Sequence, residues 1–105
     1  MKKYCCKFDL SKGLKDFERA KKYVGDGDTN FAEYAELPFV KTIKFYLENV
    51  EGGRIDIESE NTLSKKEKDL IENYISGQCT DGIGEGLEQH YNVAMFISDE
   101  GIFEL

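Results

Sequence analysis

The sequence predicts a single compact α+β domain that spans residues 1–105. Two segments, residues 3–10 and 41–48, alternate apolar and polar side chains, which is the pattern of a half-buried β-strand. A capping box at residues 64–67 opens a helix that follows these two segments. The length and the 40% share of hydrophobic residues suit one hydrophobic core.

The N-terminal segment predicts a strand followed by a helix. Tyr4, Cys6, Phe8 and Leu10 share one face of residues 3–10, with charged residues and Cys5 on the other face. Ser11 is a candidate N-cap for a helix whose apolar side chains recur at helical spacing. Gly25 ends this helix.

The middle of the chain predicts a short helix and a β-hairpin. Residues 31–37 form the short helix, which Pro38 stops. The strand at 41–48 is followed by a turn at 51–53 and by a second strand over 54–58.

The C-terminal part completes the fold. Ser64 and Glu67 begin the second long helix, and Gly77 is a candidate for its end. Residues 92–98 are apolar on both faces, which predicts a central strand, and residues 102–105 add a strand at the sheet edge. The resulting order β-α-β-β-α-β is that of the ferredoxin-like fold, with an extra C-terminal edge strand.

Charge is distributed unevenly along the acidic chain, which has a formal net charge of −7. Residues 1–24 contain eight Lys or Arg against three acids, whereas residues 77–105 contain six acids and no Lys or Arg. An acidic surface repels nucleic acid and favours a protein partner with a basic surface. The basic cluster of residues 2–22 lacks a binding motif with interleaved aromatics, so nucleic-acid binding is not expected.

Targeting signals are not evident in the sequence. No apolar stretch is long enough to cross a membrane, and the charged start lacks the apolar core of a signal peptide. The odd number of cysteines, three, without a C-x-x-C motif favours reduced thiols. We therefore expect a cytoplasmic protein with no membrane association. Cys6 is expected to fill the core and Cys5 to be an exposed thiol.

The most unusual segment is 77–89, with four glycines and three acids in thirteen residues. This composition predicts a loop of defined shape that connects the second long helix to the strand at 92–98. Its acids and the missing Lys-Ser/Thr argue against a phosphate-binding loop. The residues that we expect to form a partner-binding loop are Gln78, Asp81, Gly82, Gly84, Glu85, Gly86, Glu88 and Gln89.

Two weaker patterns suggest metal or thiol chemistry. Asp26, Asp28 and Asn30 match the first ligand positions of an EF-hand loop, but Phe31 stands where that loop requires glycine. A solvated turn is the simpler interpretation. A second set could hold zinc or form a thiol–imidazole pair, although its spacing matches no usual zinc pattern. This set consists of Cys79, Asp81, Glu85, Glu88 and His90.

A resemblance to a known family lies in residues 75–89. This segment resembles the hallmark G-Q-x-[ST]-D-G-x-G-E-G-x-E-Q of small uncharacterised proteins from bacterial mobile elements and prophages. Ile83 and Leu87 stand where those proteins have aromatic residues. The resemblance implies a genomic setting and no particular activity.

A second likeness concerns ArdA-type antirestriction proteins, which are acidic mimics of DNA. Residues 36–39 and 96–104 are similar to short pieces of those proteins, in the same order. This likeness implies inhibition of a host defence nuclease.

Together these observations favour a small acidic, non-enzymatic accessory protein of a mobile element that binds another protein. DNA mimicry is one form that this binding can take, and no catalytic residue, metal or cofactor is expected. The alternative is a small metal- or cysteine-dependent enzyme centred on the glycine-rich segment. The sequence leaves the oligomeric state open.

Overall fold

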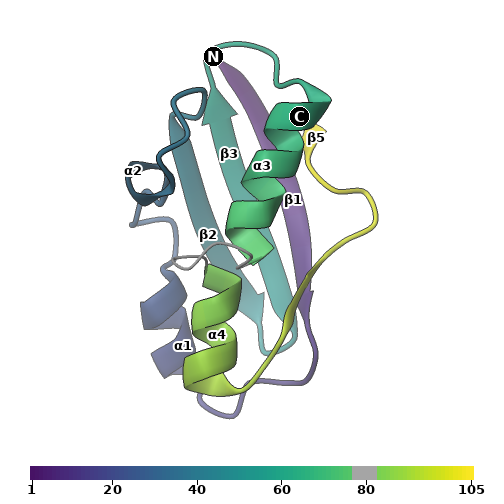
Figure 1. The fold of residues 1–105 in the computed structure, drawn as a ribbon. Helices are drawn as coiled ribbons and strands as arrows, with labels where there is room; N and C mark the ends of the chain where they lie inside the picture. Colours follow the sequence, from purple (N-terminus) through teal and green to yellow (C-terminus); the bar gives the residue numbers. More distant parts are fainter. Residues whose placement is uncertain (77–82) are drawn as a thin grey trace.

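The computed structural model of the chain describes residues 1–76 and 83–105. Within these residues a five-stranded sheet is combined with four helices (Figure 1). The elements in chain order are β1 (Lys2–Leu10), α1 (Phe17–Val24), α2 (Ala32–Ala35), β2 (Thr42–Asn49), β3 (Gly52–Ser59), α3 (Lys65–Ser76), α4 (Ile83–Tyr91), β4 (Met95–Ile97) and β5 (Phe103–Glu104).

The sheet is antiparallel, with the order β2-β3-β1-β4, and β5 also pairs with β1. β1 pairs with β3 from Lys2 to Asp9 along one edge. Along its other edge, Phe8 lies opposite Ile97 of β4, and Cys5 lies opposite Phe103 of β5. β2 also pairs antiparallel with β3, from Thr42 opposite Glu58 to Asn49 opposite Gly52. The predicted hairpin of β2 and β3 and the C-terminal edge strand are therefore confirmed.

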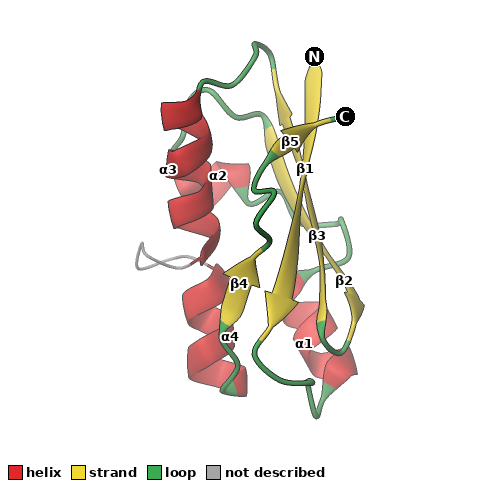
Figure 2. Cartoon of the chain, turned by 90° about the vertical axis from the view of Figure 1, so that its right-hand side faces the viewer, coloured by secondary structure: helices red, strands yellow, loops and turns green. Residues whose placement is uncertain are grey.

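The hydrophobic core lies between the sheet and its helices. Figure 2 shows α2, α3 and α4 on one side of the sheet. The apolar side chains of β1, β2 and β3 point to this side, and the residues between them point to the other side, because successive strand residues face opposite ways. The fully buried large residues of the core are Tyr4, Phe8, Ile43, Phe45, Leu47, Ile55, Ile57, Ile71, Ile75, Leu87, Val24 and Val93.

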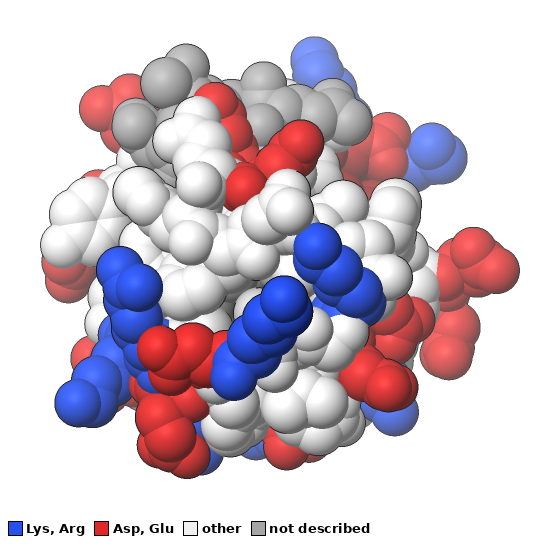
Figure 3. Space-filling view, turned by 90° about the horizontal axis from the view of Figure 1, so that it is seen from below, with Lys and Arg blue, Asp and Glu red and all other residues white. Residues whose placement is uncertain are grey.

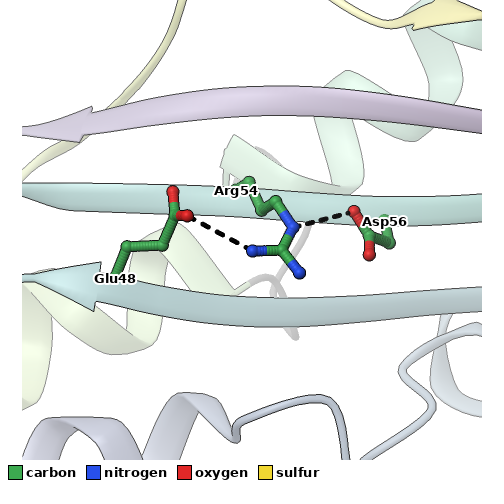
Figure 4. A network of polar contacts seen from close by, with 3 residues as sticks. All are labelled: Glu48, Arg54 and Asp56. Carbon is green, nitrogen blue, oxygen red and sulfur yellow. Dashed lines mark hydrogen bonds and ion pairs between the residues drawn. The ribbon is translucent and has the colours of Figure 1, made fainter. Parts of the chain in front are cut away.

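The opposite face of the sheet is polar. Arg54 of β3 lies between Glu48 and Asp56, with N···O distances of 3.2 and 3.3 Å (Figure 4). Its guanidinium also lies 4.1 Å from the ring centroid of Tyr46. Such a cation–π contact contributes about 1 kcal/mol at a half-exposed site, more than exposed ion pairs usually do.

The outer edge of β2 is covered by the turn that precedes α2. The Gly27 N–H donates to the carbonyl of Phe45 at 3.0 Å, and the Phe31 N–H donates to that of Ile43 at 2.8 Å. The Asn30 side-chain oxygen accepts the Ile43 N–H at 3.0 Å. These bonds occupy backbone groups that would otherwise be open to edge-to-edge association.

The predicted helix boundaries hold in part. The capping box of α3 is confirmed, because Ser64 Oγ accepts the Glu67 N–H at 3.1 Å while Glu67 Oε1 accepts the Ser64 N–H at 2.9 Å. Ser11 does not cap α1. Its hydroxyl instead accepts the Ala94 N–H at 2.9 Å, and Asp16 caps α1 by accepting the Arg19 N–H.

The C-terminal part departs further from the prediction. Residues 83–91 form helix α4, where the sequence predicted a loop. The expected central strand at 92–98 is reduced to the three residues of β4, which among the described strands pair with β1 alone. The α+β class is confirmed, but the element order β-α-α-β-β-α-α-β-β differs from β-α-β-β-α-β.

A buried hydrogen bond joins β1 to the start of α3. The Leu63 N–H donates to the Tyr4 hydroxyl at 2.9 Å, and Tyr4 is 1% exposed. Leu63 is also buried and immediately precedes the N-cap Ser64. The Tyr4 hydroxyl therefore fixes the position of the start of α3 relative to β1.

We expect Tyr4→Phe to lower the free energy of unfolding by about 2 kcal/mol, because the buried Leu63 N–H loses its acceptor. The aromatic ring is retained, so the loss is specific to the hydroxyl. Urea denaturation measures the effect. Tyr34→Phe is the matched control, since Tyr34 is 62% exposed. Equal stability of the two variants would contradict the role of this hydrogen bond.

Candidate functional site

The glycine-rich segment singled out in the sequence is helical in its second half. Gly84, Glu85, Gly86, Glu88 and Gln89 lie on α4, so the prediction of a loop is wrong for these residues. The other three members of the predicted partner-binding loop lie outside the described residues. They are Gln78, Asp81 and Gly82.

Close packing explains the glycines of α4. A Cβ at position 84 would overlap the carbonyl oxygen of Ser76 at the end of α3. A Cβ at position 86 would overlap the Tyr23 hydroxyl on α1. Leu87 is fully buried, so it anchors the helix in the core. Glycine costs about 1 kcal/mol in a helix interior, and here it permits α4 to approach α3 and α1 closely.

The outer side of α4 carries the acidic surface, which we define as Glu85, Glu88 and the neighbouring Gln89. Together with Ser76 these residues line an open depression of about 420 Å³. Glu88 and Gln89 are exposed, and Gln89 Nε2 donates to Glu85 Oε1 at 3.0 Å. Among the described residues, no salt bridge involves Glu85 or Glu88. Both carboxylates are therefore available to an external cation.

The metal or thiol alternative has little support in the described residues. Cys79 and Asp81 lie outside them. Within residues 1–76 and 83–105, no group of three or more His, Cys, Asp or Glu side chains could hold a metal ion. His90 is exposed, and its ring packs against the Tyr23 ring in a T-shaped arrangement with a centroid distance of 5.7 Å.

The EF-hand-like pattern forms a turn. Asp28 Oδ1 accepts the Asp26 N–H at 2.9 Å, and backbone N–H donors lower the pKa of this carboxyl group. Asn30 directs its side-chain oxygen at the N–H groups of Ala32 and Ile43. These oxygens bind backbone donors, which agrees with the interpretation as a turn.

The two described cysteines are free and both are buried. Cys6 fills the core, as predicted. The prediction of an exposed Cys5 is wrong, because Cys5 is only 6% exposed although it faces away from the helices. Burial raises the pKa of Cys5, and the nearby Asp56 carboxylate raises it further. Burial also raises the pKa of Cys6 to about 12.

A contact between α1 and the end of α4 has no counterpart in the sequence predictions. The Tyr91 hydroxyl donates to the Arg19 carbonyl at 3.3 Å, and the Arg19 guanidinium lies 5.7 Å from the Tyr91 ring centroid. The Tyr23 ring also packs on Tyr91. No local pattern could signal this contact, because its residues are far apart in the chain.

Comparison with known proteins identifies no relative: no family model matches the chain, nor does any curated protein or any solved structure. None of the helices in the described part of the chain is long and apolar enough to cross a membrane. The interpretation of the site therefore rests on its own geometry.

We expect Gly84→Ala to destabilise the fold by about 2 kcal/mol, although alanine favours helices, because its methyl group meets backbone at Ser76. Gly86→Ala should cost less, since the Tyr23 side chain can move aside. Thermal denaturation compares the two variants. Adding Tyr23→Ala should reduce the cost of Gly86→Ala and leave that of Gly84→Ala unchanged. A stabilising effect of Gly84→Ala would refute the packing explanation.

We expect Cys5 and Cys6 to react with iodoacetamide at pH 8 at least about tenfold more slowly than free cysteine, because the reactive thiolate is suppressed by their raised pKa values. Mass spectrometry of the Cys79→Ser variant follows these two thiols alone. Denaturant should restore rapid labelling. Rapid labelling of the folded variant would show that the thiols are accessible.

Proposed function

We propose that the protein is a non-enzymatic binding protein that engages a basic surface of another protein through the acidic surface of α4. The observation that carries this proposal is the pair Glu85 and Glu88, which share one side of a packed helix and lack a basic partner among the described residues. The sequence after Lys68 reinforces it, with eight acids and no Lys or Arg.

The physical basis is electrostatic complementarity. Exposed charges at an interface mainly increase the association rate and exclude partners of the same sign. Because glycine contacts hold α4 against α1 and α3, the two carboxylates are presented without a large ordering cost. A DNA-binding enzyme is a suitable partner, since spaced carboxylates can take the places of backbone phosphates. A partner of this kind agrees with the likeness to ArdA-type antirestriction proteins and with the expected setting on a bacterial mobile element.

The fold is compatible with such an accessory protein. The sheet order β2-β3-β1-β4 supports a ferredoxin-like unit, to which α2, α4 and β5 are added. Such a unit hosts many functions, so the proposal depends on the acidic surface and not on the fold.

The test is charge reversal of this surface. We expect the double variant Glu85→Lys, Glu88→Lys to lose at least about tenfold in affinity for a partner captured from bacterial lysate, because attraction becomes repulsion. Binding of the purified partner by surface plasmon resonance measures the change. Excess duplex DNA in the capture step shows whether the partner uses a DNA-binding surface.

The matched control is Glu33→Lys, Glu51→Lys, which changes the net charge equally at exposed sites on α2 and in the β2–β3 turn. This control should retain the wild-type affinity. Retained binding by a folded Glu85→Lys, Glu88→Lys variant would refute the proposal. Competition by DNA supports mimicry, whereas capture indifferent to DNA leaves binding without mimicry.

A further inference from the structure

A basic pocket lies at the C-terminal end of α4, opposite the end that carries Glu85. Its volume is about 280 Å³. The connection from β1 to α1 contributes Lys12, Lys15 and Asp16, and α1 contributes Arg19. The end of α4 contributes His90 and Tyr91. The fold thus brings cations from the N-terminal segment to a hollow whose other wall comes from residues 90–93, far along the chain.

The cations of this basic pocket lack carboxylate partners. In the described part of the chain, no salt bridge joins Lys12, Lys15 or Arg19 to an acid. Asp16 is the one carboxylate in the lining, and its Oδ1 accepts the Arg19 N–H at 3.2 Å as the cap of α1. Three permanent positive charges therefore face one negative charge, within a protein whose net charge is −7.

Arg19 is also held in place. Its guanidinium lies over the Tyr91 ring, while the Tyr91 hydroxyl donates to the Arg19 carbonyl. A guanidinium restrained by an aromatic ring loses less conformational entropy when it binds an oxyanion. Figure 3 shows this end of the molecule from below, and several Lys and Arg side chains project from the surface toward the viewer.

We propose that the basic pocket binds the phosphoryl group of a small phosphorylated molecule. Lysine supplies point charge to phosphate oxygens, arginine supplies paired N–H donors, and His90 adds a ring nitrogen at the rim. Phosphoryl groups carry more negative charge than a single carboxylate, so they match three cations better. A long nucleic acid fits less well, because it would extend toward the acidic residues of the same end.

This pocket is distinct from the acidic surface, and its ligand has the opposite charge to the proposed protein partner. The two sites share α4, with Glu85 in its first turn and His90 in its last turn. A failure of one proposal therefore leaves the other open, provided that the variants keep α4 folded.

The experiment titrates the full chain with inorganic pyrophosphate by calorimetry, and maps the site by amide chemical shifts. Wild-type protein should bind one pyrophosphate, with shifts centred on residues 12–16 and 90–93. Lys12→Gln, Lys15→Gln should weaken binding by at least about tenfold, because charge-assisted hydrogen bonds are lost. The control Lys22→Gln, Lys66→Gln removes the same charge at exposed sites outside the pocket lining and should bind like wild type.

Three results would overturn the proposal: no saturable binding of pyrophosphate, equal weakening by both double variants, or shifts centred elsewhere. Binding of a short duplex DNA that pyrophosphate cannot displace would also overturn it. A parallel titration with a nucleoside diphosphate identifies the source of the phosphoryl group. Tighter binding than pyrophosphate points to an organic phosphate, and equal binding points to the inorganic ion.

Discussion

The hydrogen-bonded position of β1 between two sets of strands is the constraint on which the rest of the structure depends. β3 pairs along one edge of β1, and β4 and β5 share the other edge. Because Tyr4, Cys6, Phe8 and Leu10 of β1 share the buried face, a one-residue slip would expose that face. The Tyr4 hydroxyl extends this constraint to α3 through its bond from Leu63. The sheet therefore determines where the first long helix of the C-terminal half begins.

The position of α4 follows from two contacts that only glycine permits. Gly84 brings the helix against the end of α3, and Gly86 brings it against Tyr23 of α1. Overpacking at Gly84 would displace the helix, because the backbone at Ser76 cannot give way, whereas the Tyr23 side chain can move aside at Gly86. The same contacts therefore fix the acidic surface at one end of α4 and the wall of the basic pocket at the other.

The acidic start of α4 and the cations gathered beside its C-terminal end agree with the dipole of a helix. Glu85 lies in the first turn, where negative charge is favourable, and Lys12, Lys15 and Arg19 lie around the pocket at the other end, where positive charge is favourable. The cations of the N-terminal segment join the C-terminal end through Arg19 and Tyr91. A chain with an uneven charge distribution thus forms a domain that presents two separate surfaces of opposite sign.

The sequence by itself determined the α+β class, the strands β1, β2 and β3, and the capping box of α3. Each depends on local signals: period-two alternation, a glycine turn, and the spacing of Ser64 and Glu67. Only the tertiary structure decided the features for which local signals give the wrong prediction. Gly84 and Gly86 suggest a loop by composition, yet packing against Ser76 and Tyr23 makes them helical.

Cys5 occupies the outward position of an alternating strand but is buried among its cross-strand neighbours. The basic pocket is likewise invisible in the sequence, since Lys12 and Lys15 meet His90 and Tyr91 only after the chain has folded. Local propensity acts over a few residues, whereas close approach and charge convergence depend on segments that the fold alone brings together.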